Sequence, residues 1–138
     1  MIFDFFDELN WLAIVVATIV WFAFAAAWYS VPAMSKAWQK AANIEQPQGG
    51  GPVASLLIAT LIFYFITTVV IALLVRAVGA DSVGDGLALG VALGVAFGVL
   101  TAFVSQLYER KGTYYWLING LAQLIAWSAV SIILAVWD

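Results

Sequence analysis

The chain has 138 residues, of which 65% are hydrophobic and 9% are charged, and its formal net charge is −3 at pH 7. This number of charged residues is too small to cover the surface of a globular protein in water. The composition therefore excludes an ordinary soluble domain and predicts an integral membrane protein. No basic block occurs in the chain, which argues against a nucleic-acid partner. The chain also has no cysteine and no histidine, so it lacks the commonest soft metal ligands and the commonest general acid–base group. We therefore expect no catalytic residue, no metal site and no cofactor.

Four long apolar segments divide the chain. Short polar connections separate them, and each is long enough to cross a hydrocarbon core about 30 Å thick. We therefore predict an all-α fold, an integral membrane four-helix bundle with short interfacial helices, in a single transmembrane domain over residues 1–138. The predicted spanning helices cover about residues 11–31, 53–76, 85–107 and 114–137.

The end of the first segment has the composition of a membrane interface. Trp28 and Tyr29 are followed by Pro32, which interrupts the helical hydrogen-bond ladder. The aromatic pair suits the level of the lipid headgroups. Lys36 and Trp38 follow in a short amphipathic stretch, from which the lysine can extend its ammonium group to the headgroups. We expect these five residues to lie at the interface.

The second segment contains a polar stripe. Thr60, Tyr64 and Thr67 fall within about 60° of one another on a helix that turns about 100° per residue. One interpretation is that the stripe lines a polar path together with residues of the last segment. The other, which we favour, is that each threonine hydroxyl donates to the backbone carbonyl one turn earlier.

The third segment has four glycines at strict four-residue spacing, which form one shallow stripe on a helix. Helices in a bilayer associate through close backbone approach at small residues, so we predict that this segment is a glycine zipper. By the same count Thr101 and Ser105 fall on the glycine side and extend the groove. Its partner is either another helix of the same chain or a helix of a second protein. The four glycines are Gly86, Gly90, Gly94 and Gly98.

The last segment carries two amides, Asn119 and Gln123, one helical turn apart. An uncharged amide inside a bilayer is costly unless it is hydrogen-bonded, so we expect both amides to have partners. Either the amides hold neighbouring helices together, or they line a path for a solute. Interhelical hydrogen bonds of this kind serve packing more often than conduction, and we favour packing.

The positions of the basic residues predict an orientation. Lys36 and Lys40 lie in the first connection and Arg110 and Lys111 in the third, whereas only Arg76 borders the second. Connections rich in lysine and arginine stay in the cytoplasm. We therefore predict a multi-pass protein of the plasma (inner) membrane with both termini outside the cytoplasm.

Two runs near the first segment resemble a known family. They are Asn10-Trp11-Leu12-Ala13 and Trp28-Tyr29-Ser30-Val31-Pro32-Ala33-Met34-Ser35-Lys36-Ala37-Trp38. With the glycine-rich third segment and Leu117-Ile118-Asn119-Gly120, they are similar to the domain of unknown function 1761 family. The resemblance implies a small four-helix membrane protein, chiefly bacterial, and names no activity. Members tend to carry an acidic residue and a histidine on the last helix, where this chain has Asn119 and Gln123, so a proton-linked role is not expected.

These patterns favour one function and leave a second open. The first is a non-catalytic membrane protein that acts through helix packing, as a homo-oligomer or an accessory of a larger membrane complex. The alternative is a homo-oligomeric channel or facilitator for a small uncharged solute. Coupled ion transport is not expected, because no charged residue lies well inside a predicted span.

Overall fold

The computed structural model describes residues 1–31, 36–37, 40–41, 54–109 and 112–137, and every regular element in these ranges is helical. Four helical spans are long and apolar enough to cross a membrane. The all-α prediction is therefore confirmed, and the bounds of the four long helices lie within two residues of the expected ones. In chain order the elements are η1 (Ile2–Glu8), α1 (Trp11–Ser30), α3 (Ala54–Val78), α4 (Val83–Leu93), η2 (Gly94–Val99), α5 (Leu100–Glu109) and α6 (Thr113–Val136).

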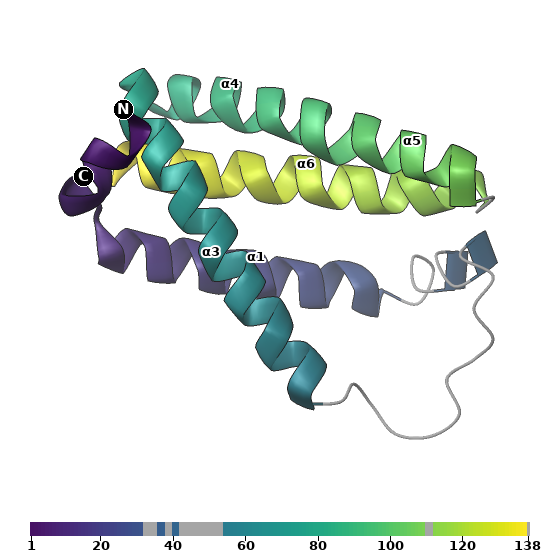
Figure 1. Ribbon diagram of the computed structural model, residues 1–138. Coiled ribbons are helices and arrows are strands. Elements are labelled where there is room, and N and C mark those ends of the chain that lie inside the picture. The colour runs from purple at the N-terminus through teal and green to yellow at the C-terminus, as the bar shows by residue number, and fades with distance from the viewer. Residues whose placement is uncertain (32–35, 38–39, 42–53, 110–111, 138) are drawn as a thin grey trace.

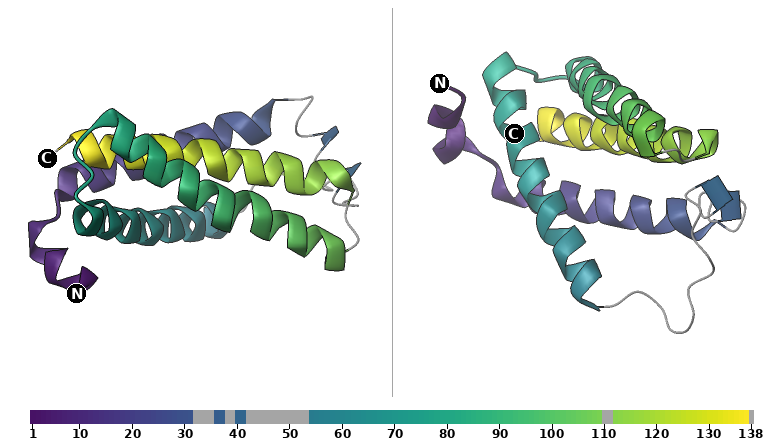
Figure 2. Two further views of the ribbon diagram at one scale, coloured as in Figure 1. Left: turned by 90° about the horizontal axis from the view of Figure 1, so that it is seen from above. Right: turned by 45° about the vertical axis from the view of Figure 1, so that its right-hand side comes forward.

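Three of the four spans run side by side, and the fourth crosses them (Figure 1). The span formed by α4, η2 and α5 is one continuous rod that packs along the length of α6, and α1 packs on another side of α6. Helix α3 contacts α1 and α6 near its C-terminal end, while its N-terminal part points away from the other spans, as Figure 1 and the right view of Figure 2 show. Three spans therefore pack around α6 as one unit, and the N-terminal part of α3 diverges from it.

Side-chain caps define where two of the spans begin. The side-chain oxygen of Asn10 accepts a hydrogen bond from the backbone N–H of Ala13 at 3.1 Å, and Ser82 accepts one from Asp85 at 3.1 Å. Such caps satisfy backbone donors that have no partner inside the helix. Asn10 also donates through its amide to the carbonyl of Trp137 at 3.3 Å. The start of α1 and the end of α6 therefore lie at the same end of the bundle.

The buried core lies between α1, α6 and the C-terminal part of α3. Small and β-branched residues dominate it, which lets the helices approach closely where hydrophobic burial gives little driving force. Every buried residue of α3 lies at or after Thr68. The main core residues are Ala13, Ile14, Ala17, Ile71, Ala72, Val75, Ala126 and Val130.

The N-terminal part of α3 has no buried residue. We call residues 54–63 the free half of α3. Three of its side chains, Leu56, Ile58 and Phe63, are 62%, 59% and 65% exposed. Apart from Ser55 and Thr60 this surface is apolar, so it suits lipid or another membrane helix better than water.

Candidate functional site

The four glycines of the third span lie against α6 of the same chain. A Cβ atom built on Gly90 meets the Cα of Ser128 at 2.4 Å, and one on Gly94 meets the Cα of Leu124 at 2.7 Å. A Cβ built on Gly86 meets the Cα of Ile132 at 2.7 Å, and one built on Gly98 meets the Cβ of Gln123 at 2.9 Å. Real Cβ atoms essentially never come this close to backbone, so only glycine permits this approach. Of the two partners left open by the sequence, a helix of the same chain occupies the glycine face.

The glycine face does not continue to Thr101. Residues Gly94–Val99 form a π-helical turn, in which the N–H of Leu100 donates to the carbonyl of Val95, five residues back. The hydroxyl of Thr101 likewise donates to Ala96 five residues back, at 3.3 Å, and Thr101 is exposed. A π turn holds one residue more than an α turn, so the later side chains are rotated relative to the glycines. The expectation of one continuous groove is therefore wrong at Thr101, while Ser105 is half-buried.

Helix α6 carries polar side chains at four-residue intervals along one stripe: Asn119, Gln123, Trp127 and Ser131. Asn119 accepts a hydrogen bond from the hydroxyl of Tyr29 at 2.6 Å, which ties the end of α1 to the start of α6. The sequence correctly indicated a need for a partner, but it assigned Tyr29 to the headgroup region. No local pattern pairs residues 90 positions apart, so only the antiparallel packing of α1 on α6 reveals this contact.

Several buried polar atoms of this region have no hydrogen-bond partner among the described residues. They are the Nε1 atoms of Trp28 and Trp127, the Oε1 atom of Gln123 and the Oγ atom of Ser131. A buried polar group without a partner costs roughly 1–3 kcal/mol. Gln123 is the most notable, because it lies near the middle of α6 beside Gly98. Asn119 has the expected partner, whereas the Oε1 atom of Gln123 has none among the described residues.

An aromatic cluster joins the three core helices at one level. The ring of Trp21 on α1 stacks on that of Tyr64 on α3, with centroids 3.9 Å apart and planes 6° apart. Trp127 on α6 packs edge-on against Trp21 at 6.3 Å. Tyr64, predicted as part of a polar stripe, thus belongs to an aromatic contact. The part of α3 that precedes this contact leaves the bundle, whereas the part that follows it is docked.

The two threonines of the predicted stripe bond to their own helix. Thr60 donates to the carbonyl of Leu56 at 2.7 Å, and Thr67 donates to that of Phe63 at 2.9 Å. The favoured interpretation of these residues is therefore confirmed. Neither hydroxyl is left with a free proton to direct toward Asn119 or Gln123.

The interfacial residues are described only in part. Trp28 and Tyr29 are half-buried, and Lys36 is exposed in a short helical piece. Pro32 and Trp38 lie outside the described residues. The N–H of Gly112 donates to the carbonyl of Ala41 at 2.7 Å, so the connection after α1 is held against the start of α6.

The motifs and the helical architecture agree with a single family. The chain belongs to the family described as "Protein of unknown function (DUF1761)", which matches residues 12–135. The family resemblance expected from the sequence is thus confirmed over nearly the whole chain. No curated protein and no solved structure matches it.

Membership of this family assigns no reaction, substrate or partner. Within the described part of the chain, no group of three acidic, cysteine or histidine residues is placed to hold a metal ion. The protein is polytopic, with four candidate membrane spans, and these spans imply a lipid bilayer around it. Any role must come from the surfaces and contacts described above.

Proposed function

We propose that this protein is a non-catalytic membrane module that acts through helix packing, either with copies of itself or as an accessory of a larger membrane complex. The observation that carries the proposal is the free half of α3, which no other described helix of the chain covers. The lack of histidine and cysteine supports a role without catalysis. The proposal concerns this surface and not the glycine face, which α6 already occupies.

The free half borders an apolar groove between α1 and α3. The groove has a volume of about 370 Å³, and the only polar group in its lining, the hydroxyl of Thr18, donates to its own helix at Ile14. The tilt of a membrane helix is set by the neighbours against which it packs, and among the described residues the free half has no such neighbour. A helix from a second protein would supply one. The residues that line the groove are Val15, Thr18, Ile19, Leu61, Ile62 and Phe65.

The same proposal covers the role of the four glycines of the third span and the orientation of the protein in the membrane. The glycine face acts as a zipper that fixes α4 on α6, so that the third and fourth spans move as one unit. Both termini lie outside the cytoplasm of a bacterial inner membrane. Lys36 and Lys40 follow α1 at one end of the bundle, while Arg76 lies near the other, and this arrangement supports the orientation.

The mass of the purified protein in mild detergent, with all co-purifying proteins identified, tests the packing role. We expect either a defined homo-oligomer or stoichiometric recovery of other membrane subunits. The double variant Leu61→Ala/Ile62→Ala should release the partner, because it removes apolar contacts from the groove. Leu100→Ala/Val104→Ala is the matched control, since it removes similar exposed side chains from α5. A monomer with no bound protein, or equal loss in both variants, contradicts the proposal.

A second candidate, a facilitator for a small uncharged solute, is favoured by one observation. The Oε1 atom of Gln123 is buried without a partner near the middle of a span. Gln123→Leu should abolish solute flux into proteoliposomes while the protein remains folded if this amide contacts the solute. If Gln123 has no such role, removal of the unpaired amide should leave flux unchanged and raise stability by about 1 kcal/mol.

A further inference from the structure

The two ends of the bundle differ in charge. Lys36 and Lys40 are exposed at the end where α1 finishes and α6 begins, and the sequence places Arg110 and Lys111 directly before Gly112. Glu109 is the one acidic residue described at this end, and the sequence adds Glu45 in the connection after α1. The opposite end carries exposed acidic residues on η1, on the turn before α4 and in the first turn of α4, namely Asp4, Asp7, Glu8, Asp81 and Asp85. In a chain with a net charge of −3, one end is therefore cationic.

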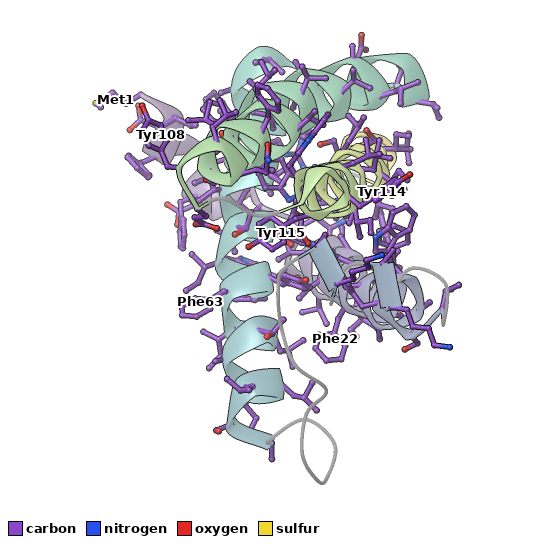
Figure 3. The ribbon with its side chains drawn as sticks, turned by 90° about the vertical axis from the view of Figure 1, so that its right-hand side faces the viewer. Met1, Phe22, Phe63, Tyr108, Tyr114 and Tyr115 are labelled. Atoms are coloured by element: carbon purple, nitrogen blue, oxygen red, sulfur yellow. The ribbon has the colours of Figure 1, made fainter. Side chains whose placement is uncertain are left out.

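A cavity of about 420 Å³ lies at this cationic end. Its walls come from two segments far apart in sequence, the short helical piece after α1 and the start of α6. They are joined by the hydrogen bond from Gly112 to Ala41, and a Cβ built on Gly112 meets the Cα of Ala41 at 3.0 Å. Figure 3 shows Tyr114 on the outer side of α6, whereas Tyr115 lies toward the interior of the bundle. The lining residues are Ala37, Lys40, Ala41, Gly112 and Tyr114.

We propose that this cavity binds the phosphate headgroup of an anionic phospholipid. Lys40 supplies an ammonium group and Tyr114 a phenolic hydroxyl, both of which donate to phosphate oxygens, and Lys36 adds a second positive charge one turn away. The volume is in the range of small-ligand sites. The alanines and Gly112 leave the space for the headgroup open, because none of them has a side chain longer than a methyl group.

The position of the cavity selects a lipid over a free anion. Its lining residues follow α1 and begin α6, so in a bilayer crossed by these spans the cavity would meet the headgroups and the acyl chains of a bound lipid would stay beside the spans. Anionic lipids attract lysine and arginine at the cytoplasmic surface of membranes. The inference is independent of any partner at the free half of α3, which lies on a different part of the molecule.

Lipid retention in mild detergent tests the proposal. The full-length protein is incubated with mixed micelles of phosphatidylglycerol and phosphatidylethanolamine, and bound lipids are counted by native mass spectrometry. We expect selective retention of phosphatidylglycerol, and an approximately fivefold weaker retention in Lys40→Gln, as one lysine near an anionic surface contributes. Ala37→Leu should weaken it similarly by filling the cavity without a change of charge.

Arg76→Gln is the matched control, because it removes one positive charge near the opposite end. Its lipid retention should equal that of the wild type. Equal losses in Lys40→Gln and Arg76→Gln would indicate a general charge effect and overturn the site. Full retention in Ala37→Leu would also overturn it. If inorganic phosphate alone displaces phosphatidylglycerol and raises the unfolding temperature as much, the site takes a free anion and the lipid assignment is wrong.

Discussion

The second and third spans are both strongly apolar, with mean hydropathy 2.7 and 2.4, yet they pack differently. The third lies on α6 along its whole length, while α3 touches the core only through its C-terminal part (Figures 1 and 2). The difference lies in side-chain size. Glycine recurs every four residues on the third span, whereas the free half of α3 presents leucine, isoleucine and phenylalanine. In a bilayer, apolar character does not bring helices together, because lipid is equally apolar. Small residues that allow close approach do so.

The largest effect should come from filling the glycine face. Gly90→Ala places a methyl group 2.4 Å from the Cα of Ser128, so α4 must shift away from α6, and we expect a loss of about 3 kcal/mol in the free energy of unfolding. Denaturant unfolding in detergent measures it. Gly84→Ala is the matched control in the same helix, since its methyl group meets only the Ser82 hydroxyl at 3.8 Å. Gly84→Ala should be neutral or slightly stabilising, and equal losses would show that the comparison is wrong.

The stacked contact between Tyr64 and Trp21 should help to hold the C-terminal part of α3 against α1. Tyr64→Leu removes the stacked ring against Trp21, and we expect it to reduce the free energy of unfolding by about 1 kcal/mol. The neighbouring change Phe63→Leu alters an exposed ring of the free half and should have little effect. Thermal unfolding in the same detergent distinguishes the two. A larger loss in Phe63→Leu would mean that the free half is covered by a partner that survives purification.

The hydrogen bond between Tyr29 and Asn119 should contribute modestly. Interhelical hydrogen bonds in membrane proteins are worth about 0.6 kcal/mol on average, so a double-mutant cycle of Tyr29→Phe and Asn119→Leu should give a coupling energy of about that size. Unfolding of the wild type, both single variants and the double variant supplies the four values required. A coupling energy indistinguishable from zero would show that α1 is held on α6 by packing alone.

The smallest effect belongs to the threonines of α3. Thr60→Val replaces a hydroxyl that is bonded to its own helix at Leu56, and it should change the free energy of unfolding by less than about 0.5 kcal/mol. Thr60→Val should also leave any solute flux unchanged. A loss of flux without a loss of stability would return Thr60 to the polar path that the sequence left open.

Different residues show where sequence reasoning succeeded and where it stopped. The helical spans followed from apolar runs of sufficient length, and the bonds of Thr60 and Thr67 followed from local helix geometry, because both depend on neighbours within one turn. The glycine face was recognisable from its spacing, but its partner was not. Thr101 was misplaced because no pattern in the sequence indicated the π turn at Gly94–Val99. The contact between Tyr29 and Asn119 and the cavity at Lys40 join segments far apart in the chain.

The sequence by itself determined that this is a four-span, all-helical membrane protein of a family without an assigned function, since hydropathy and helical period act locally. Only the tertiary structure decided that α6 packs against the glycines, that the part of α3 before Tyr64 leaves the bundle, and that a cavity containing Lys40 forms between the segment after α1 and the start of α6. The physical reason is that packing in a bilayer depends on which small faces meet. That choice depends on the whole set of helices at once.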